Sequence, residues 1–174
     1  MLNQTITSTK GAFTNIPISK ITDILDYVDK SLIKIDTKQK IKVISNLNIL
    51  TPWGPIIYGT GGLHHSQSGL YKADDEWMIL DIDVGSLYPS IAVQNNLYPE
   101  HLGPIFSKIY DDNIVSVRLA EKAKPKKERD PVIMEGFKLA ANGAYGKSNE
   151  ESSFLYDPQY TMKTTLNGQL LLTM

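Results

Sequence analysis

A carboxylate, that of Asp83, stands where a predicted strand gives way to a turn. Residues Met78–Asp83 alternate apolar and acidic side chains at the period of a strand, so Asp81 and Asp83 share one face. Gly85 and Ser86 then break the strand, and a short helix is predicted to begin at Ser86. The free backbone N–H groups of a helix start suit an anion such as a triphosphate, and carboxylate oxygens suit Mg²⁺. The stretch therefore predicts either a metal–nucleotide site or an ordinary solvated Asp-x-Gly turn.

A second group of polar and aromatic residues lies on a helix predicted from Pro131 to Lys147. Lys138, Asn142 and Tyr145 fall at positions i, i+4 and i+7, and so share one helix face. A lysine is a suitable point charge for phosphate, and an aromatic side chain can contact a base. This face favours a nucleotide contact, and the alternative is a solvated lysine beside a core tyrosine.

Both stretches match motifs of one enzyme family. The octapeptide from Asp83 to Ser90 resembles the first polymerase motif of family B DNA polymerases, Asp-x-x-Ser-Leu-Tyr-Pro-Ser, at every fixed position. The segment from Lys138 to Gly146 is similar to the family's Lys-x-x-x-Asn-Ser-x-Tyr-Gly motif, with Gly143 where Ser is usual. The resemblance covers about residues 56–174 and is most like phage or plasmid enzymes.

In the first motif, the resemblance implies a role for each matched residue. Asp83 is the expected catalytic carboxylate and metal ligand, in a mechanism that uses two Mg²⁺ ions. Asp81 is a neighbour on the same face. Ser86 and Leu87 are expected to offer backbone N–H groups to the triphosphate. Tyr88 is expected to stack under the incoming sugar and to exclude a 2′-hydroxyl group.

In the second motif, Lys138 is the expected catalytic cation for the triphosphate. Asn142 and Tyr145 are expected to contact the nascent base pair, and Gly146 the DNA. Gly143 removes the hydroxyl group that serine provides in relatives.

A basic stretch lies between the two motifs. Its cations are Arg118, Lys122, Lys124, Lys126, Lys127 and Arg129. In the family, basic residues of the fingers helices hold the triphosphate. Arg118 and Lys122 share a helix face and are our candidates; the alternative is a solvated helix tip.

A glycine-rich stretch from Tyr58 to His65 precedes the first motif. Family B polymerases carry a Tyr-x-Gly-Gly segment that touches the template strand at the entry to the palm, and this stretch looks similar. Aligning Gly61 and Gly62 places Gly59 at the tyrosine position, with Tyr58 one place early. Tyr58, Gly61 and Gly62 are therefore predicted to contact DNA. Adjacent histidines on a strand point to opposite faces, so a shared metal-ligand role for His64 and His65 is not predicted.

The composition predicts a soluble, intracellular protein. The chain has 174 residues, 41% hydrophobic residues, no cysteine and a formal net charge of −1, which gives no global signature of nucleic-acid binding. It shows neither a signal peptide nor an apolar run of the roughly 20 residues that span a bilayer. We expect it in the cytoplasm, that of the host cell if the protein is viral, with no membrane partner.

The resemblance implies an α+β fold, with a partial palm built on an antiparallel sheet and a short two-helix fingers unit. The expected segments are a lead-in of unknown role (1–50), a first palm segment (51–104), fingers (105–147) and a return to the palm (148–174). The expected helices are 19–35, 86–95, 105–122, 131–147 and 166–174. The expected strands are 41–50, 78–83 and 160–164, with a hairpin turn at 73–76.

The expected function is template-directed DNA synthesis from a DNA primer–template and dNTPs. No Tyr-x-Asp-Thr-Asp-like segment follows Gly146, and nothing resembles a thumb or a proofreading exonuclease. Because two-metal catalysis needs a second carboxylate, the isolated chain is expected to be inactive. It is expected to be one piece of a split enzyme, completed by a second polypeptide, or a truncated frame. The alternative is a non-catalytic module that binds nucleotide or DNA, or a remnant.

Overall fold

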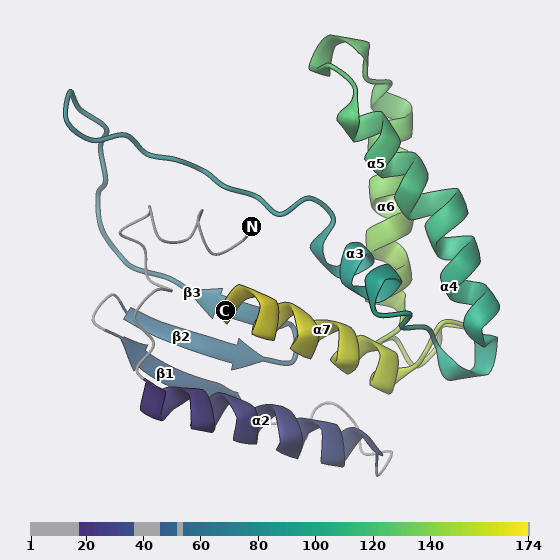
Figure 1. Ribbon diagram of the computed structural model, residues 1–174, viewed down its shortest axis with the longest axis horizontal. Helices are drawn as coiled ribbons and strands as arrows, with labels where there is room; N and C mark the ends of the chain where they lie inside the picture. Colours follow the sequence, from purple (N-terminus) through teal and green to yellow (C-terminus); the bar gives the residue numbers. More distant parts are fainter. Residues whose placement is uncertain (1–17, 37–45, 52–53, 174) are drawn as a thin grey trace.

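The computed structural model describes residues 18–36, 46–51 and 54–173. The fold is α+β, as expected: a small antiparallel sheet and two helices lie together, and a group of helices extends from the end of this unit (Figure 1). No helix in these ranges is long and apolar enough to cross a membrane.

The sheet has three strands in the order β1-β2-β3, namely β1 (Leu47–Thr51), β2 (Gly54–Gly59) and β3 (Gly62–His65). In the antiparallel register Ile49 lies opposite Ile56, and Tyr58 lies opposite Leu63. Strand β1 confirms the C-terminal part of the strand predicted for 41–50. Residues 41–45 lie outside the described ranges.

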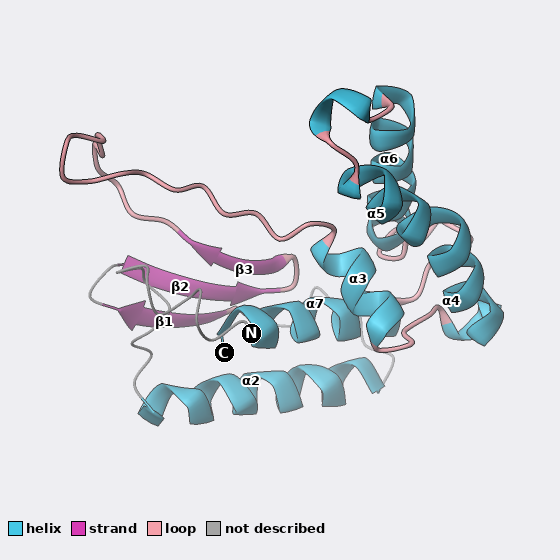
Figure 2. Ribbon diagram, turned by 45° about the horizontal axis from the view of Figure 1, so that its top comes forward, coloured by secondary structure: helices cyan, strands magenta, loops and turns pink. Residues whose placement is uncertain are grey.

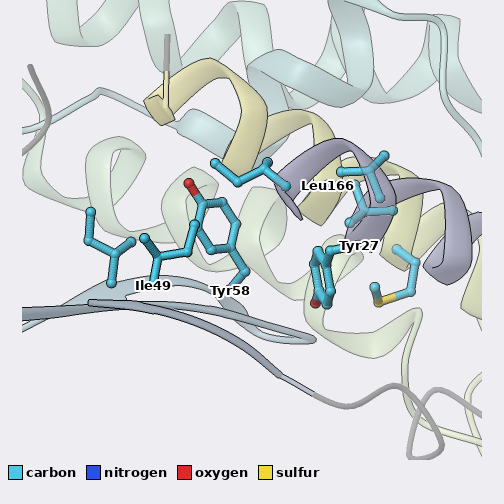
Figure 3. Close-up of a cluster of buried hydrophobic side chains, with 8 residues drawn as sticks. Tyr27, Ile49, Tyr58 and Leu166 are labelled. Atoms are coloured by element: carbon cyan, nitrogen blue, oxygen red, sulfur yellow. The ribbon is translucent and has the colours of Figure 1, made fainter. Parts of the chain in front are cut away.

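One face of the sheet is covered by α2 (Ile18–Asp36) and α7 (Pro158–Thr173), as Figure 2 shows. Side chains from both helices and from β1 and β2 form the first core cluster: Ile24, Tyr27, Val28, Ile49, Ile56, Tyr58, Met162 and Leu166 (Figure 3). The helix predicted for 19–35 is confirmed, and its residues Ile24, Tyr27 and Val28, at helical spacing, are buried in this cluster.

The helical group comprises α3 (Leu87–Gln94), α4 (Pro104–Tyr110), α5 (Ser116–Ala123) and α6 (Pro131–Lys147). A π-helical turn, Asp111–Val115, joins α4 to α5, so the helix predicted for 105–122 is confirmed with a local irregularity. Short 3₁₀ turns lie at Glu100–Leu102 and Lys126–Glu128. A second core cluster holds this group together: Ala92, Tyr110, Val115 and Tyr160.

Helix α6 has the bounds predicted from the sequence. The Asp130 side chain accepts hydrogen bonds from the N–H groups of Val132 (2.8 Å) and Ile133 (3.3 Å), and Pro131 occupies the first turn. An aspartate cap followed by a proline specifies a helix start through local interactions alone.

The strand predicted for 160–164 is wrong, because these residues belong to α7. Asp157 caps this helix by accepting a hydrogen bond from the N–H group of Tyr160 (3.0 Å). The hydroxyl groups of Thr164 and Thr165 donate to carbonyl groups four residues earlier, so these β-branched residues are buried with their polar atoms paired.

The strand predicted for 78–83 is also wrong. The turn predicted at 73–76 is present, with a hydrogen bond from the N–H group of Asp74 to the Trp77 carbonyl (3.0 Å). The residues on both sides of this turn belong to no strand, so the predicted hairpin is wrong, and residues 78–84 run without regular structure toward α3. A strand needs a hydrogen-bonded neighbour, and none lies beside 78–84 within the described ranges, so the three-stranded sheet does not carry Asp83.

Candidate functional site

Two tyrosines from the two sequence motifs are in direct contact. The rings of Tyr88, in the first turn of α3, and Tyr145, near the end of α6, stack with centroids 4.5 Å apart and planes inclined by 19°. The hydroxyl groups of Tyr145 and Thr165, on α7, are hydrogen bonded at 2.6 Å. The structure thus joins two predicted site residues that are far apart in the sequence.

Three glycines lie against the Tyr88 side chain. The Tyr88 hydroxyl group donates a hydrogen bond to the Gly61 carbonyl at 3.3 Å. A Cβ atom on Gly62, whose φ is +140°, would lie 2.5 Å from that hydroxyl oxygen, and one on Gly168 would lie 3.1 Å from the ring. The predicted residues Gly61 and Gly62 therefore help to form the Tyr88 pocket, together with Gly168, which the sequence patterns did not indicate.

Gln169 fixes the turn that carries these glycines. Its buried amide nitrogen donates hydrogen bonds to the carbonyls of Gly59 (2.6 Å) and Gly62 (2.9 Å). No sequence pattern indicated this role, because the contact joins α7 to a turn early in the chain. Thr165 was missed for the same reason.

Burial reinforces the neutral state of the stacked tyrosines. Desolvation raises the pKa of Tyr88 above its ordinary value. It also raises the pKa of Tyr145, opposed by the hydrogen bond to Thr165 and reinforced by Tyr88. Both phenols are therefore neutral at physiological pH and can donate hydrogen bonds.

The turn before α3 lies beneath a cation from α5. Ser86 has φ 57° and ψ 43°, a left-handed conformation that few non-glycine residues adopt. A Cβ atom on Gly85 would lie 2.7 Å from Nζ of Lys122, so the ammonium group sits against the turn. The Ser86 hydroxyl group is buried and has no hydrogen-bond partner.

Arg118 lies one turn before Lys122 on α5. It is 9% exposed, and its Nε atom is buried without a hydrogen-bond partner. Leaving a buried charged donor unpaired is costly, so this guanidinium group is suited to an anion. Leu87, the other residue of the predicted phosphate nest, begins α3.

The remaining predicted residues of the second motif face solvent. Lys138 forms an exposed ion pair with Glu135 at 3.3 Å, and Asn142 is exposed. Gly143 and Gly146 have open space where a Cβ atom would lie. This side of α6 is therefore accessible to a ligand.

Tyr58 lies elsewhere. Its side chain is fully buried in the first core cluster, and its hydroxyl group is hydrogen bonded to that of Thr173 at 2.8 Å. Its ring has no surface with which to contact DNA. Of the two glycines predicted with it, Gly61 is exposed, whereas Gly62 is covered by Tyr88.

The carboxylates of the first motif lie on the exposed segment that leads into the turn before α3. Asp81 and Asp83 are exposed in the segment 78–84, which belongs to no strand. Asp83 could supply one metal ligand, but the described ranges hold no group of three His, Cys, Asp or Glu side chains that could bind a metal ion. These residues do not fit a complete two-metal centre, so we derive no catalytic step through Mg²⁺.

No family model, no curated protein and no solved structure matches this chain.

Proposed function

We propose that this chain binds a deoxynucleoside triphosphate beside α3, α5 and α6, as the palm-and-fingers segment of a family B-like DNA polymerase. The observation that carries the proposal is the stack of Tyr88 on Tyr145. Each tyrosine belongs to one of the two polymerase-like motifs, and nothing in their local sequences requires the motifs to meet. Their contact supports a single site built from both.

Polar groups of the turn before α3 and of α5 favour an anionic ligand. Lys122 lies against Gly85, Arg118 has an unpaired Nε atom, and the Ser86 hydroxyl group is unpaired. A triphosphate would pair with these groups, and Tyr88 would adjoin the sugar. Lys138, on the accessible side of α6, would add a further cation.

The reaction proposed for the assembled enzyme is template-directed addition of dNTPs to a DNA primer. The second carboxylate and the thumb would have to be supplied from outside residues 1–174. A non-catalytic nucleotide-binding module is the second candidate, favoured by the position of Asp83 on an exposed segment outside the sheet.

Equilibrium binding of a fluorescent dNTP to the full chain in the presence of Mg²⁺ tests the nucleotide site. We expect Lys122→Ala to weaken binding by about 10- to 100-fold, the effect of losing a charged hydrogen bond of about 1.5–3 kcal/mol. Lys127→Ala, in the exposed 3₁₀ turn, is the matched control and should bind normally. Equal affinities for the two variants would contradict the site.

Primer extension separates the two candidates. Synthesis after addition of a polypeptide that bears a paired-aspartate hairpin and a thumb would support the polymerase segment. In that enzyme, Tyr88→Ala should reduce discrimination against ribonucleotides. Tight dNTP binding without any extension would favour the binding module.

A further inference from the structure

A polar pocket lies at the other end of α3 from Tyr88. It has a volume of about 340 Å³ and is bounded by the connector that follows α3 and by the first turns of α7, which lie side by side in Figure 1. This volume is within the range of sites that hold small molecules. The lining includes five polar side chains: Asn96, Tyr98, Glu100, Gln159 and Lys163.

Hydrogen bonds fix the two walls of this pocket relative to one another. One oxygen of the Asp157 carboxylate accepts from the N–H group of Glu100 (2.7 Å), and the other accepts from the N–H group of Tyr160 (3.0 Å). Next to this clamp, Nε2 of His101 donates to the Phe154 carbonyl (2.7 Å). The walls are therefore in place before a ligand arrives, which favours binding because little has to be ordered.

The polar groups of the lining are available to a ligand. Among the residues that the structure describes, the ammonium group of half-buried Lys163 and the carboxylate of Glu100 have no ion-pair partner. Within the same ranges, the side-chain amides of Asn96 and Gln159 and the hydroxyl group of Tyr98 have no hydrogen-bond partner. Unpaired polar groups that converge on one concave surface are suited to a ligand that carries several polar groups itself.

These groups match the parts of a nucleotide. An aromatic ring such as that of Tyr98 is a stacking surface for a base, and a lysine such as Lys163 is a point charge for a phosphate. The Glu100 carboxylate can accept a hydrogen bond from the exocyclic amino group of adenine, cytosine or guanine. The amide groups of Asn96 and Gln159 can both donate and accept, as the remaining positions of a base edge require.

The charges of the pocket disfavour a bare anion. Glu100 and Asp157 place two carboxylates in the lining beside the single ammonium group of Lys163, so inorganic phosphate would meet more repulsion than attraction there. A nucleotide carries its phosphate and its base at opposite ends. Its phosphate can therefore meet the lysine while its base, with an amino group, meets a carboxylate.

We propose that this pocket binds a single nucleotide with an amino-bearing base, the base against Tyr98 and Glu100 and the phosphate at Lys163. The nucleotide is either a free nucleoside monophosphate or an unpaired nucleotide of a DNA strand, which share this chemistry. The pocket shares no residue with the dNTP site proposed above, so the two proposals can fail separately.

Isothermal titration calorimetry of the full chain with dAMP tests the pocket. We expect Lys163→Ala to weaken dAMP binding by about 10- to 100-fold, the effect of losing a charged hydrogen bond. Lys108→Ala, at an exposed position on α4, is the matched control and should bind dAMP normally. Absence of saturable dAMP binding, or equal affinities for the two variants, would overturn the proposal.

Lys122→Ala separates the two nucleotide sites. This substitution removes a cation of the proposed dNTP site, and dAMP should still bind to it with the affinity of the parent chain. A loss of dAMP affinity in Lys122→Ala would place dAMP in the dNTP site and overturn the second site.

A single-stranded oligodeoxyadenylate identifies the source of the nucleotide. Tighter binding of the oligonucleotide than of dAMP, weakened in Lys163→Ala, would assign the pocket to an unpaired nucleotide of a strand. Tighter binding of dAMP would assign it to free nucleotides.

Base selectivity gives a second measurement if Lys163→Ala fails to fold. Because dTMP has no exocyclic amino group, the parent chain should bind dAMP about fivefold or more tightly than dTMP. Glu100→Ala should remove this preference without disturbing the fold, since the side chain is exposed and its carboxylate has no partner among the described residues. Equal affinities of the parent chain for dAMP and dTMP would overturn the proposal.

Discussion

Tyr88 is held by three different regions of the chain. Tyr145 stacks on its ring, the Gly61 carbonyl accepts a hydrogen bond from its hydroxyl group, and Gly168 leaves room for its edge. The side chain therefore contributes to folding as well as to any ligand site, and its two contributions can be separated by substitution.

We predict that Tyr88→Ala lowers the free energy of unfolding by about 2–3 kcal/mol, because it removes both the stacked pair and buried aromatic area. Tyr88→Phe should cost less than about 1 kcal/mol, since its hydrogen bond of 3.3 Å is long and the ring remains. Urea denaturation measures both. A larger loss for Tyr88→Phe than for Tyr88→Ala would contradict this account.

Gly62 should tolerate no side chain. Its φ of +140° disfavours any L-residue, and a Cβ atom would lie 2.5 Å from the Tyr88 hydroxyl oxygen. We predict that Gly62→Ala destabilises the fold by about 2 kcal/mol or more. Tyr88→Phe should recover some of this loss in a double-mutant cycle, because it removes the clashing oxygen.

The matched control is Gly61→Ala, at the neighbouring exposed position with open space around its Cβ atom. We expect it to change stability by less than about 0.5 kcal/mol in the same denaturation experiment. An equal cost at the two glycines would mean that the Tyr88 hydroxyl group does not determine the effect.

The sequence motifs singled out residues whose contacts they did not predict. Tyr88, Tyr145 and Gly62 were all selected from motifs, and the structure brings them together. Tyr58 was selected from a similar pattern but is buried, because its place in β2 turns its ring toward the core. Inward or outward orientation depends on what covers a strand, which local sequence does not reveal.

At the scale of elements, Glu121 joins the end of α5 to the start of α6. Its carboxylate accepts hydrogen bonds from the Lys124 ammonium group (2.7 Å) and from the N–H group of Asp130, the capping residue of α6 (2.7 Å). These two bonds hold the pKa of Glu121 below its ordinary value, and the bond from Lys124 has the larger effect.

A depressed pKa predicts a loss of stability in acid. The stabilisation by Glu121 is present above the pKa of the unfolded chain, about 4.3, and is lost as the pH falls through the lower pKa of the folded state. We predict that Glu121→Gln is less stable than the parent chain at pH 7 and that this difference shrinks below about pH 4. Thermal unfolding across this pH range measures it, and a difference that stays constant with pH would count against the role of the charge.

The elements that the sequence predicted best are those specified by their own residues. Asp130 and Pro131 define the start of α6 without help from the rest of the chain. The segments 78–83 and 160–164 have comparable strand-like patterns, but a strand exists only with a neighbour. The second segment instead becomes helical, where the Asp157 cap and burial beside Leu166 outweigh the weak helix propensity of threonine.

At the scale of the whole molecule, α7 connects the two core clusters. Met162 and Leu166 belong to the cluster beneath the sheet, whereas Tyr160 belongs to the cluster of the helical group. The same helix donates the Gln169 hydrogen bonds to the β2–β3 turn. The sheet and the helical group should therefore unfold together.

Leu166→Ala tests this coupling. Removing a fully buried leucine side chain should lower the free energy of unfolding by about 2–4 kcal/mol. Because α7 belongs to both clusters, we predict that amide protection falls by a similar free energy in β2 and in α4, although Leu166 lies in the first cluster. Ile49→Ala, on the far side of that cluster, should give the same pattern if unfolding is cooperative. Hydrogen exchange measured by mass spectrometry resolves these elements. Loss of protection confined to the sheet and α2 would mean that the helical group folds by itself, and that the hydrogen bonds Tyr88–Gly61 and Tyr145–Thr165 join two independent units.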